Sequence, residues 1–242
     1  MHRLILALGL SLFITSVNAE KLRVGSVSTQ VVLLHGLARS SASMEALAVH
    51  LQSHHYQVCN VSYPSTDFSV EVLAAEYVVP AIRSCFADPN IALNFVTHSM
   101  GGIIVRQLVH AHLIDKVGRV VMLAPPNHGS EIVDRLGELS LFQWLNGPAG
   151  SQLGTSEQSL PQRLGPAAFE LGIIAGNSSI NLLLSMLISG DDDGKVSIES
   201  AKLEGMADFK VVASTHPFIM KDRQDVWPLV LNFLRDGRFE TL

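Results

Sequence analysis

Short apolar segments alternate along this chain with longer segments whose apolar residues recur at helical spacing. The short segments are rich in β-branched residues and lack polar alternation, which is typical of parallel strands covered on both faces. We expect strands over residues 30–34, 57–62, 91–96, 119–123, 171–175 and 209–213. We expect helices over residues 42–54, 70–86, 100–113, 131–139, 178–188 and 226–235. This order predicts an α/β fold with a mostly parallel central sheet and helices on both faces.

Length and charge indicate a single domain without a nucleic-acid partner. The chain has 242 residues, of which 48% are hydrophobic, so residues 20–242 can bury one large core. The formal net charge is −5, and no run of basic residues interrupts the sequence. The charge pattern therefore gives no reason to expect binding to nucleic acid.

The first 19 residues have the composition of an export signal. His2 and Arg3 supply positive charge, and residues 4–17 form an apolar stretch that is short for a membrane span. Small residues follow at the expected cleavage positions, so we expect a signal peptide over residues 1–19 and a periplasmic or secreted protein. The alternatives are an uncleaved N-terminal anchor and a buried first element of a cytosolic protein. Residues 20–28 are expected to form an irregular first strand.

Cys59 and Cys85 are the two cysteines of the chain. In an oxidising compartment, two cysteines favour one disulfide. Cys59 belongs to a predicted strand and Cys85 to the end of the next predicted helix, and consecutive elements of a βα unit pack together. The sequence is equally compatible with a disulfide and with two buried free thiols.

The most specific chemical signal is the hexapeptide Thr97-His98-Ser99-Met100-Gly101-Gly102. It lies between a predicted strand and a predicted helix, where a sharp turn exposes the oxygen of Ser99 at the C-terminal edge of the sheet. The two glycines leave room where the strand and the helix pass close together. Thr97 stands where the G-x-S-x-G pattern has its first glycine, which tightens the turn. The alternative is a serine in an ordinary glycine-containing loop.

Together with His35-Gly36-Leu37, this hexapeptide resembles the lipase/esterase branch of the α/β-hydrolase superfamily. The segment Leu123–Ser130 is similar to the corresponding segment of bacterial lipase-like and GPI inositol-deacylase-like serine hydrolases. Asp193-Gly194-Lys195-Val196 and the late His216 complete the resemblance. It covers nearly the whole chain after the export signal, and it implies an α/β-hydrolase fold with a triad in the order Ser, Asp, His.

A serine nucleophile needs a base that removes its proton and an acid that orients the base. Ser99 is the predicted nucleophile. His216 follows the last predicted strand and is the predicted base. The family pattern places the acid immediately before a glycine, so Asp193 is the predicted acid within the acidic triplet 191–193. The alternatives are a solvated acidic turn or a cation site at the triplet, with Glu131 as a rival acid.

The tetrahedral intermediate of acyl transfer needs preorganised donors for its oxyanion. We expect these donors to be the backbone N–H groups of Met100, directly after the nucleophile, and of Leu37. His35 and His98 flank the two turns and are expected to form local hydrogen bonds.

This chemistry requires no metal and no organic cofactor. His50 and His54 have the i, i+4 spacing of a metal site on a helix, but no third ligand is evident from the sequence. We therefore expect a solvated helix face at this pair.

Residues 130–165 are rich in Gly, Ser, Gln and Pro, and lack the pattern of core elements. We expect a small lid or cap beside the active site, since loops at this edge of the sheet carry function. The alternative is a surface connection whose aromatic residues cover the rim of the core. Residues 180–188 would either line an acyl pocket or form a helix packed on the sheet. The large apolar residues of the predicted lid are Leu139, Leu141, Phe142, Trp144 and Leu145.

These features predict an exported serine hydrolase that cleaves carboxylic esters through acylation of Ser99 and attack by water assisted by His216. The expected substrate is a small-molecule ester or a lipid, and transient contact with a membrane or lipid surface stays open. The alternatives are an acyltransferase or thioesterase that uses the same triad, and a binding protein that keeps the fold without catalysis. The acyl length, the head group and the oligomeric state are not determined by the sequence.

Overall fold

The computed structural model describes residues 28–240, except residues 89, 138, 180–187 and 189. Its centre is a sheet with the strand order β2-β1-β3-β4-β5-β6, in which every neighbouring pair is parallel. The predicted parallel sheet is confirmed, and each predicted strand end lies within two residues of the observed one. The strands are β1 (Gln30–Leu34), β2 (Gln57–Val61), β3 (Leu93–His98), β4 (Val117–Leu123), β5 (Glu170–Gly176) and β6 (Asp208–Val212).

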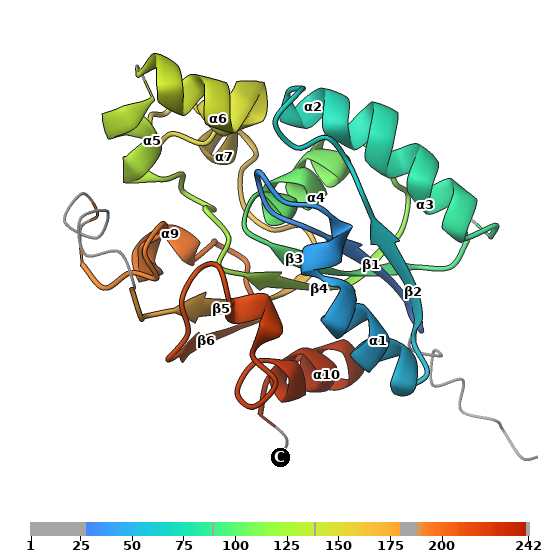
Figure 1. Cartoon of the computed structure of the whole chain (residues 1–242). Helices are drawn as coiled ribbons and strands as arrows, with labels where there is room; N and C mark the ends of the chain where they lie inside the picture. Colours follow the sequence, from blue (N-terminus) through green and yellow to red (C-terminus); the bar gives the residue numbers. More distant parts are fainter. Residues whose placement is uncertain (1–27, 89, 138, 180–187, 189, 241–242) are drawn as a thin grey trace, which may run out of the picture.

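Helices cover both faces of this sheet, as the sequence predicts (Figure 1). On one face lie α3 and α4, and on the other lie α1 and α10. The described helices are α1 (Glu45–Ser53), α2 (Val70–Val72), α3 (Val79–Cys85), α4 (Met100–His110), α5 (Glu131–Leu136), α6 (Ser140–Ser151), α7 (Leu160–Arg163), α9 (Ile198–Ala201) and α10 (Trp227–Asp236). The remaining helical segments are the 3-10 helices η1 (Ser41–Ser43) and η3 (Ile219–Lys221) and the π-helix η2 (Leu73–Val78). The π-helix joins α2 to α3.

Two apolar cores lie on the two faces of the sheet. In β1, Val32 and Leu34 belong to the core beneath α4, whereas Val31 and Leu33 belong to the core beneath α1 and α10. All four side chains are fully buried. A strand buried on both faces has no solvated side for polar residues, which explains the uninterrupted apolar runs in the sequence.

Residues 130–165 form the helices α5, α6 and α7 above the carboxyl ends of the strands (Figure 1). Leu153 and Leu160 of this segment are buried within the core beneath α4. The segment predicted as a lid is therefore partly a structural element of the domain, and its movement stays a prediction. Of its large apolar side chains, Leu139 is 55% exposed. The side chains of Leu141, Phe142, Trp144 and Leu145 lie outside the described part of the structure.

Three predictions concern residues that the structure does not describe. The export signal over residues 1–19 and most of the irregular strand over residues 20–28 belong to this group. The helix or acyl-pocket wall over residues 180–188 also falls almost entirely within it. Among the described residues, no helix combines the length and the apolar character needed to cross a membrane.

A disulfide joins Cys59 of β2 to Cys85 at the end of α3, which decides between the two alternatives left by the sequence. The bridge spans 26 residues, and a crosslink of that span stabilises a fold by about 3.5 kcal/mol in the chain-entropy model. We expect Cys59→Ala with Cys85→Ala to lower the free energy of unfolding by about 3 kcal/mol, measured by urea denaturation without reductant. A double variant as stable as the wild type would contradict this expectation.

Candidate active site

Ser99 forms the sharp turn between β3 and α4. Its backbone has φ 53° and ψ −124°, a strained conformation for a residue with a side chain. The Ser99 N–H donates to the carbonyl oxygen of Leu123 at 2.9 Å, which ties the turn to β4. A Cβ atom on Gly101 would lie 2.6 Å from the carbonyl oxygen of Leu34, so the crossing requires glycine at this position. Thr97, which replaces the first glycine of the pattern, is fully buried.

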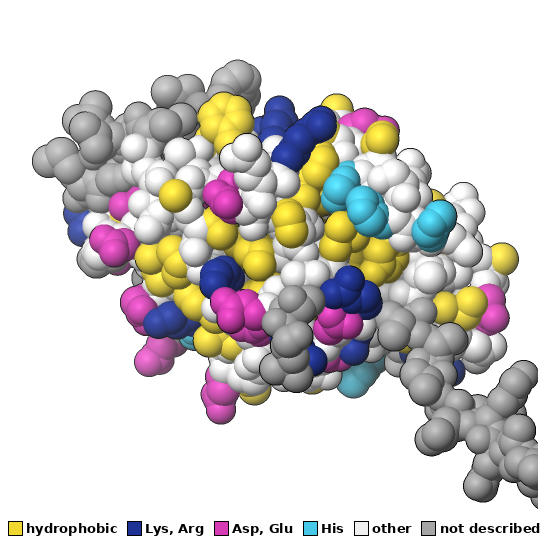
Figure 2. Space-filling view, turned by 90° about the horizontal axis from the view of Figure 1, so that it is seen from below, with side chains coloured by type: hydrophobic (Ala, Val, Ile, Leu, Met, Phe, Trp, Pro, Cys, Tyr) yellow, Lys and Arg dark blue, Asp and Glu magenta, His cyan; other side chains and the backbone are white. Residues whose placement is uncertain are grey.

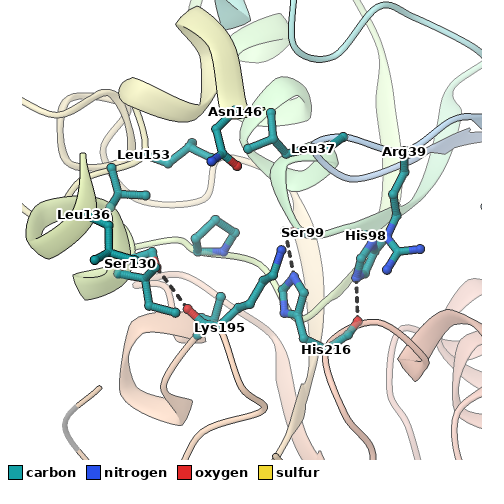
Figure 3. Close-up of a pocket in the computed structure, with 15 residues that line it drawn as sticks. Leu37, Arg39, His98, Ser99, Ser130, Leu136, Asn146, Leu153, Lys195 and His216 are labelled. Carbon is teal, nitrogen blue, oxygen red and sulfur yellow. Dashed lines mark hydrogen bonds between the residues drawn. The ribbon is translucent and has the colours of Figure 1, made fainter. Parts of the chain in front are cut away.

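The three predicted triad side chains lie within hydrogen-bonding distance of one another. Ser99 Oγ is 3.0 Å from Nε2 of His216 (Figure 3), and Nδ1 of His216 is 2.8 Å from Oδ2 of Asp193. The three residues follow β3, β5 and β6, so the parallel sheet brings their loops to one edge. His216 and Asp193 are both buried. A neutral His216 that donates from Nδ1 to Asp193 can accept the serine proton at Nε2.

The backbone around Asp193 holds its carboxylate in place. Oδ1 accepts the N–H groups of Val196 at 2.9 Å and Lys195 at 3.1 Å, which leaves Oδ2 for His216. The N–H of His216 also donates to the carbonyl oxygen of Asp193 at 2.9 Å. The loops of Asp193 and His216 are thus joined by a backbone and a side-chain hydrogen bond.

The rival acids are placed differently. Asp191 is exposed, and Oδ1 of Asp192 accepts the N–H of Gly194 at 2.6 Å. Glu131 is the first residue of α5. The atom that a rival acid would have to contact, Nδ1 of His216, is already bonded to Asp193.

The turn that contains Leu37 lies directly against Ser99. A Cβ atom on Gly36 would be 3.1 Å from Cβ of Ser99, so the close approach depends on this glycine. Within the described part of the chain, the N–H groups of Leu37 and Met100 donate to no protein acceptor. Both N–H groups are therefore available as donors, and their role as an oxyanion hole stays a prediction.

Tyr63 and Ser65, for which the sequence offers no local signal, hold this turn together with His35. The ring of His35 stacks on Tyr63 with 3.9 Å between the centroids, and the Tyr63 hydroxyl donates to the carbonyl oxygen of His35. Nδ1 of His35 lies 2.9 Å from the carbonyl oxygen of Gly36, so the expected local hydrogen bond is confirmed for His35. The N–H of Ala38 donates to Oγ of Ser65 at 3.0 Å.

His98 is buried beside the predicted triad and contacts the loop that carries His216. Its Nε2 donates to the carbonyl oxygen of His216 at 2.9 Å, so the expectation of a local hydrogen bond is wrong for His98. Burial, followed by the electrostatic effect of the neighbouring His216 and Arg39, holds the pKa of His98 well below its ordinary value. The ring therefore stays neutral at neutral pH and links the turn at Ser99 to the loop of His216.

A cavity of about 460 Å³ opens beside Ser99 and His216 (Figure 3). Arg39 and Lys195 also line it, and they come from loops on opposite sides of the Ser99–His216 pair. A cavity of this size and character is suited to an apolar chain held next to the nucleophile. The apolar residues of its wall are Leu37, Ala38, Pro126, Ile132, Val133, Leu136, Leu153 and Val196.

The buried Arg106 of α4 fixes the segment that forms the cavity wall. Its guanidinium donates to the carbonyl oxygens of Asn127 at 2.8 Å, Pro161 at 2.7 Å and Gly165 at 2.8 Å. Burial lowers the pKa of Arg106 to about 10, so the group stays charged at neutral pH. Arg106 therefore ties the loop before α5, and both α7 and the residues that follow it, to α4.

His50 and His54 lie on the α1 side of the domain, away from this cavity. Histidine side chains gather on the face of the molecule that Figure 2 shows. The two rings are 4.4 Å apart, and that of His50 also packs 4.6 Å from the ring of Trp227. In the described part of the chain, no group of three His, Cys, Asp or Glu side chains is arranged to hold a metal ion.

Comparisons with known proteins agree with this architecture. The family model described as alpha/beta hydrolase fold matches residues 29–164. Among solved structures, the mature form of lipase BlEst2 from Bacillus licheniformis is 20% identical, with a TM-score of 0.64 over 86% of this chain and 93% of that chain. No curated protein matches the chain by sequence.

Two further solved structures are similar in fold over a part of their own length. Phospholipase PlaB from Legionella pneumophila is 21% identical, with a TM-score of 0.57 over 72% of this chain and 45% of that chain. Lipase B from Aspergillus fumigatus is 16% identical, with a TM-score of 0.60 over 89% of this chain and 54% of that chain. The chain thus spans about half of each of these two proteins.

Proposed function

Because this chain belongs to the alpha/beta hydrolase fold family, we propose that it is a serine hydrolase that cleaves carboxylic esters with an apolar acyl chain. The observation that carries the proposal is the hydrogen-bonded array of Ser99, His216 and Asp193 at the wall of an apolar cavity. The lipases and the phospholipase that are similar in fold support acyl esters as the substrate class.

The proposed reaction begins with attack of Ser99 Oγ on the ester carbonyl carbon while His216 Nε2 takes the serine proton. The oxyanion is stabilised by the N–H groups of Leu37 and Met100. His216 then gives its proton to the leaving alcohol, and the acyl group remains on Ser99. A water molecule, deprotonated by His216, attacks this acyl-enzyme and releases the carboxylic acid. Asp193 holds the ring orientation and stabilises the imidazolium in both halves of the reaction.

Contact with a lipid surface forms part of the proposal. Leu139, directly before α6, and Phe218, two residues after His216, are 55% and 53% exposed. Large apolar side chains that face solvent on segments beside an active site favour binding to aggregated lipid.

The dependence on acyl length tests the substrate class. Leu136 lies in the apolar wall of the cavity and is only partly buried, so Leu136→Trp would shorten the space for an acyl chain. We expect kcat/KM for 4-nitrophenyl octanoate to fall about tenfold more than that for 4-nitrophenyl acetate. This factor corresponds to the lost burial of about two methylene groups.

A matched control is Leu229→Trp on α10, a partly buried residue that does not line this cavity. It should leave the ratio of the two kcat/KM values at its wild-type level. Equal losses on octanoate and acetate in the Leu136 variant would contradict acyl binding in this cavity.

A further inference from the structure

Two basic side chains stand at the cavity without a described partner. Arg39 is partly buried and Lys195 is exposed, and both line the cavity that contains Ser99. Within the described part of the chain, neither side chain takes part in an ion pair or a hydrogen bond. Both charges thus point to a negatively charged group that the protein itself does not supply.

The nearby carboxylate of Asp193 does not neutralise them. Its Oδ1 accepts two backbone N–H groups and its Oδ2 contacts His216, so both oxygens are engaged. Loss of hydration and the positive charge of Arg39 lower the pKa of Lys195, while Asp193 acts in the opposite direction. The formal net charge of the chain is −5. The two positive side chains at this cavity are therefore opposite in sign to the net charge of the molecule.

We propose that the alcohol part of the ester substrate carries an anionic group, a phosphate or a carboxylate, which binds between Arg39 and Lys195. This inference rests on the proposed function and assigns the chemical class of its substrate. Charge-assisted hydrogen bonds from guanidinium and ammonium groups recognise both kinds of anion.

The arrangement of the cavity wall assigns the anion to the alcohol part. Leu136 and Leu153 lie on one side of Ser99, whereas Arg39 lies on the other side, next to His98 (Figure 3). An acyl chain in the apolar half leaves the alcohol part of the same ester facing Arg39. Lys195 extends toward the Ser99–His216 pair and adds its charge where the two parts of the substrate meet (Figure 3).

The test compares esters that share a butanoyl group and differ in the alcohol part. The anionic probes are 4-butanoyloxybenzoate and 4-butanoyloxyphenyl phosphate, and the neutral probe is 4-butanoyloxybenzamide. For each enzyme, the preference is the kcat/KM of an anionic probe divided by that of the neutral probe. We expect Arg39→Gln and Lys195→Met each to lower this preference about 10-fold or more, the loss typical of one charge-assisted hydrogen bond.

Matched variants separate charge from packing. Lys195→Arg and Arg39→Lys keep the charge and should retain most of the preference. Lys221→Met removes an exposed charge that does not line the cavity and should leave the preference unaltered. Raising the ionic strength should lower the preference of the wild type and have little effect in the double variant Arg39→Gln with Lys195→Met.

The outcomes distinguish this inference from the proposed function. Loss of preference for both anionic probes supports binding of either anion, and loss for one probe assigns that anion. A preference that is the same in all variants overturns the inference while ester hydrolysis itself stands. A preference that appears only with an anion in the acyl part, as in 4-nitrophenyl hemiglutarate against 4-nitrophenyl pentanoate, overturns the assignment to the alcohol. No hydrolysis of any probe by the wild type overturns the proposed function.

Discussion

Ser99→Ala is expected to lower kcat/KM on every ester substrate by about 10⁴-fold to 10⁶-fold, the range for nucleophiles of serine triads. The hydroxyl of Ser99 is the atom that His216 contacts at 3.0 Å, and alanine leaves no oxygen to attack the carbonyl carbon. The oxyanion donors would remain, so slow turnover by water persists. Steady-state kinetics on 4-nitrophenyl esters and covalent labelling by a fluorophosphonate probe measure the two effects.

The same variant separates catalysis from folding. Ser99 occupies a positive φ of 53°, and alanine retains the Cβ atom that makes this conformation strained. The melting temperature should therefore stay close to that of the wild type while labelling is lost. Ser53 is exposed, and Ser53→Ala serves as a control that should keep both the labelling and the melting temperature of the wild type. Wild-type turnover by the Ser99 variant would show that another group is the nucleophile, or that the chain is a binding protein.

The sequence predicts those parts of the fold that follow from local pattern. The strands appear as apolar runs because each is covered on both faces, as Val31 and Val32 show by facing opposite cores. The turn at Ser99 is predictable because only small residues such as Gly101 fit where strand and helix cross. The parallel order of the strands explains why Ser99, Asp193 and His216 meet at one edge of the sheet. The choice of Asp193 within the triplet 191–193 rests on the resemblance to lipases and esterases, because strand order alone does not select one of these three acids.

The local pattern of apolar and small residues does not indicate contacts between segments that are distant in the sequence. Arg106 reads as an ordinary polar residue of a helix, yet it is 4% exposed and holds three carbonyl oxygens around residues 127–165. Leu153 and Leu160 of the same segment pack in the core, which the local pattern does not indicate either. The hydrogen bond of His98 spans 118 residues, and no local rule indicates it. The disulfide is predictable as a possibility only, since its formation depends on how β2 and α3 pack.

The substitution that isolates the acid is Asp193→Asn, for which we expect kcat/KM to fall about 10³-fold to 10⁴-fold. Asparagine can still accept the N–H groups of Val196 and Lys195 through its oxygen, so the loop should keep its shape. Its amide nitrogen would then face Nδ1 of His216 and donate to it. The imidazole would be forced to carry its proton on Nε2, where it can no longer accept the proton of Ser99.

The neighbouring acids provide the controls for this argument. Asp191 is exposed, and an asparagine at position 192 can still accept the N–H of Gly194, so Asp191→Asn and Asp192→Asn should have near wild-type rates. Glu131→Gln should behave in the same way, because Nδ1 of His216 is engaged by Asp193 at 2.8 Å. An active Asp193→Asn together with an inactive Glu131→Gln would make Glu131, the first residue of α5, the acid. A loss confined to Asp193→Asn, with labelling of Ser99 slowed in parallel, would instead show that the orientation of His216 by this one carboxylate activates the nucleophile.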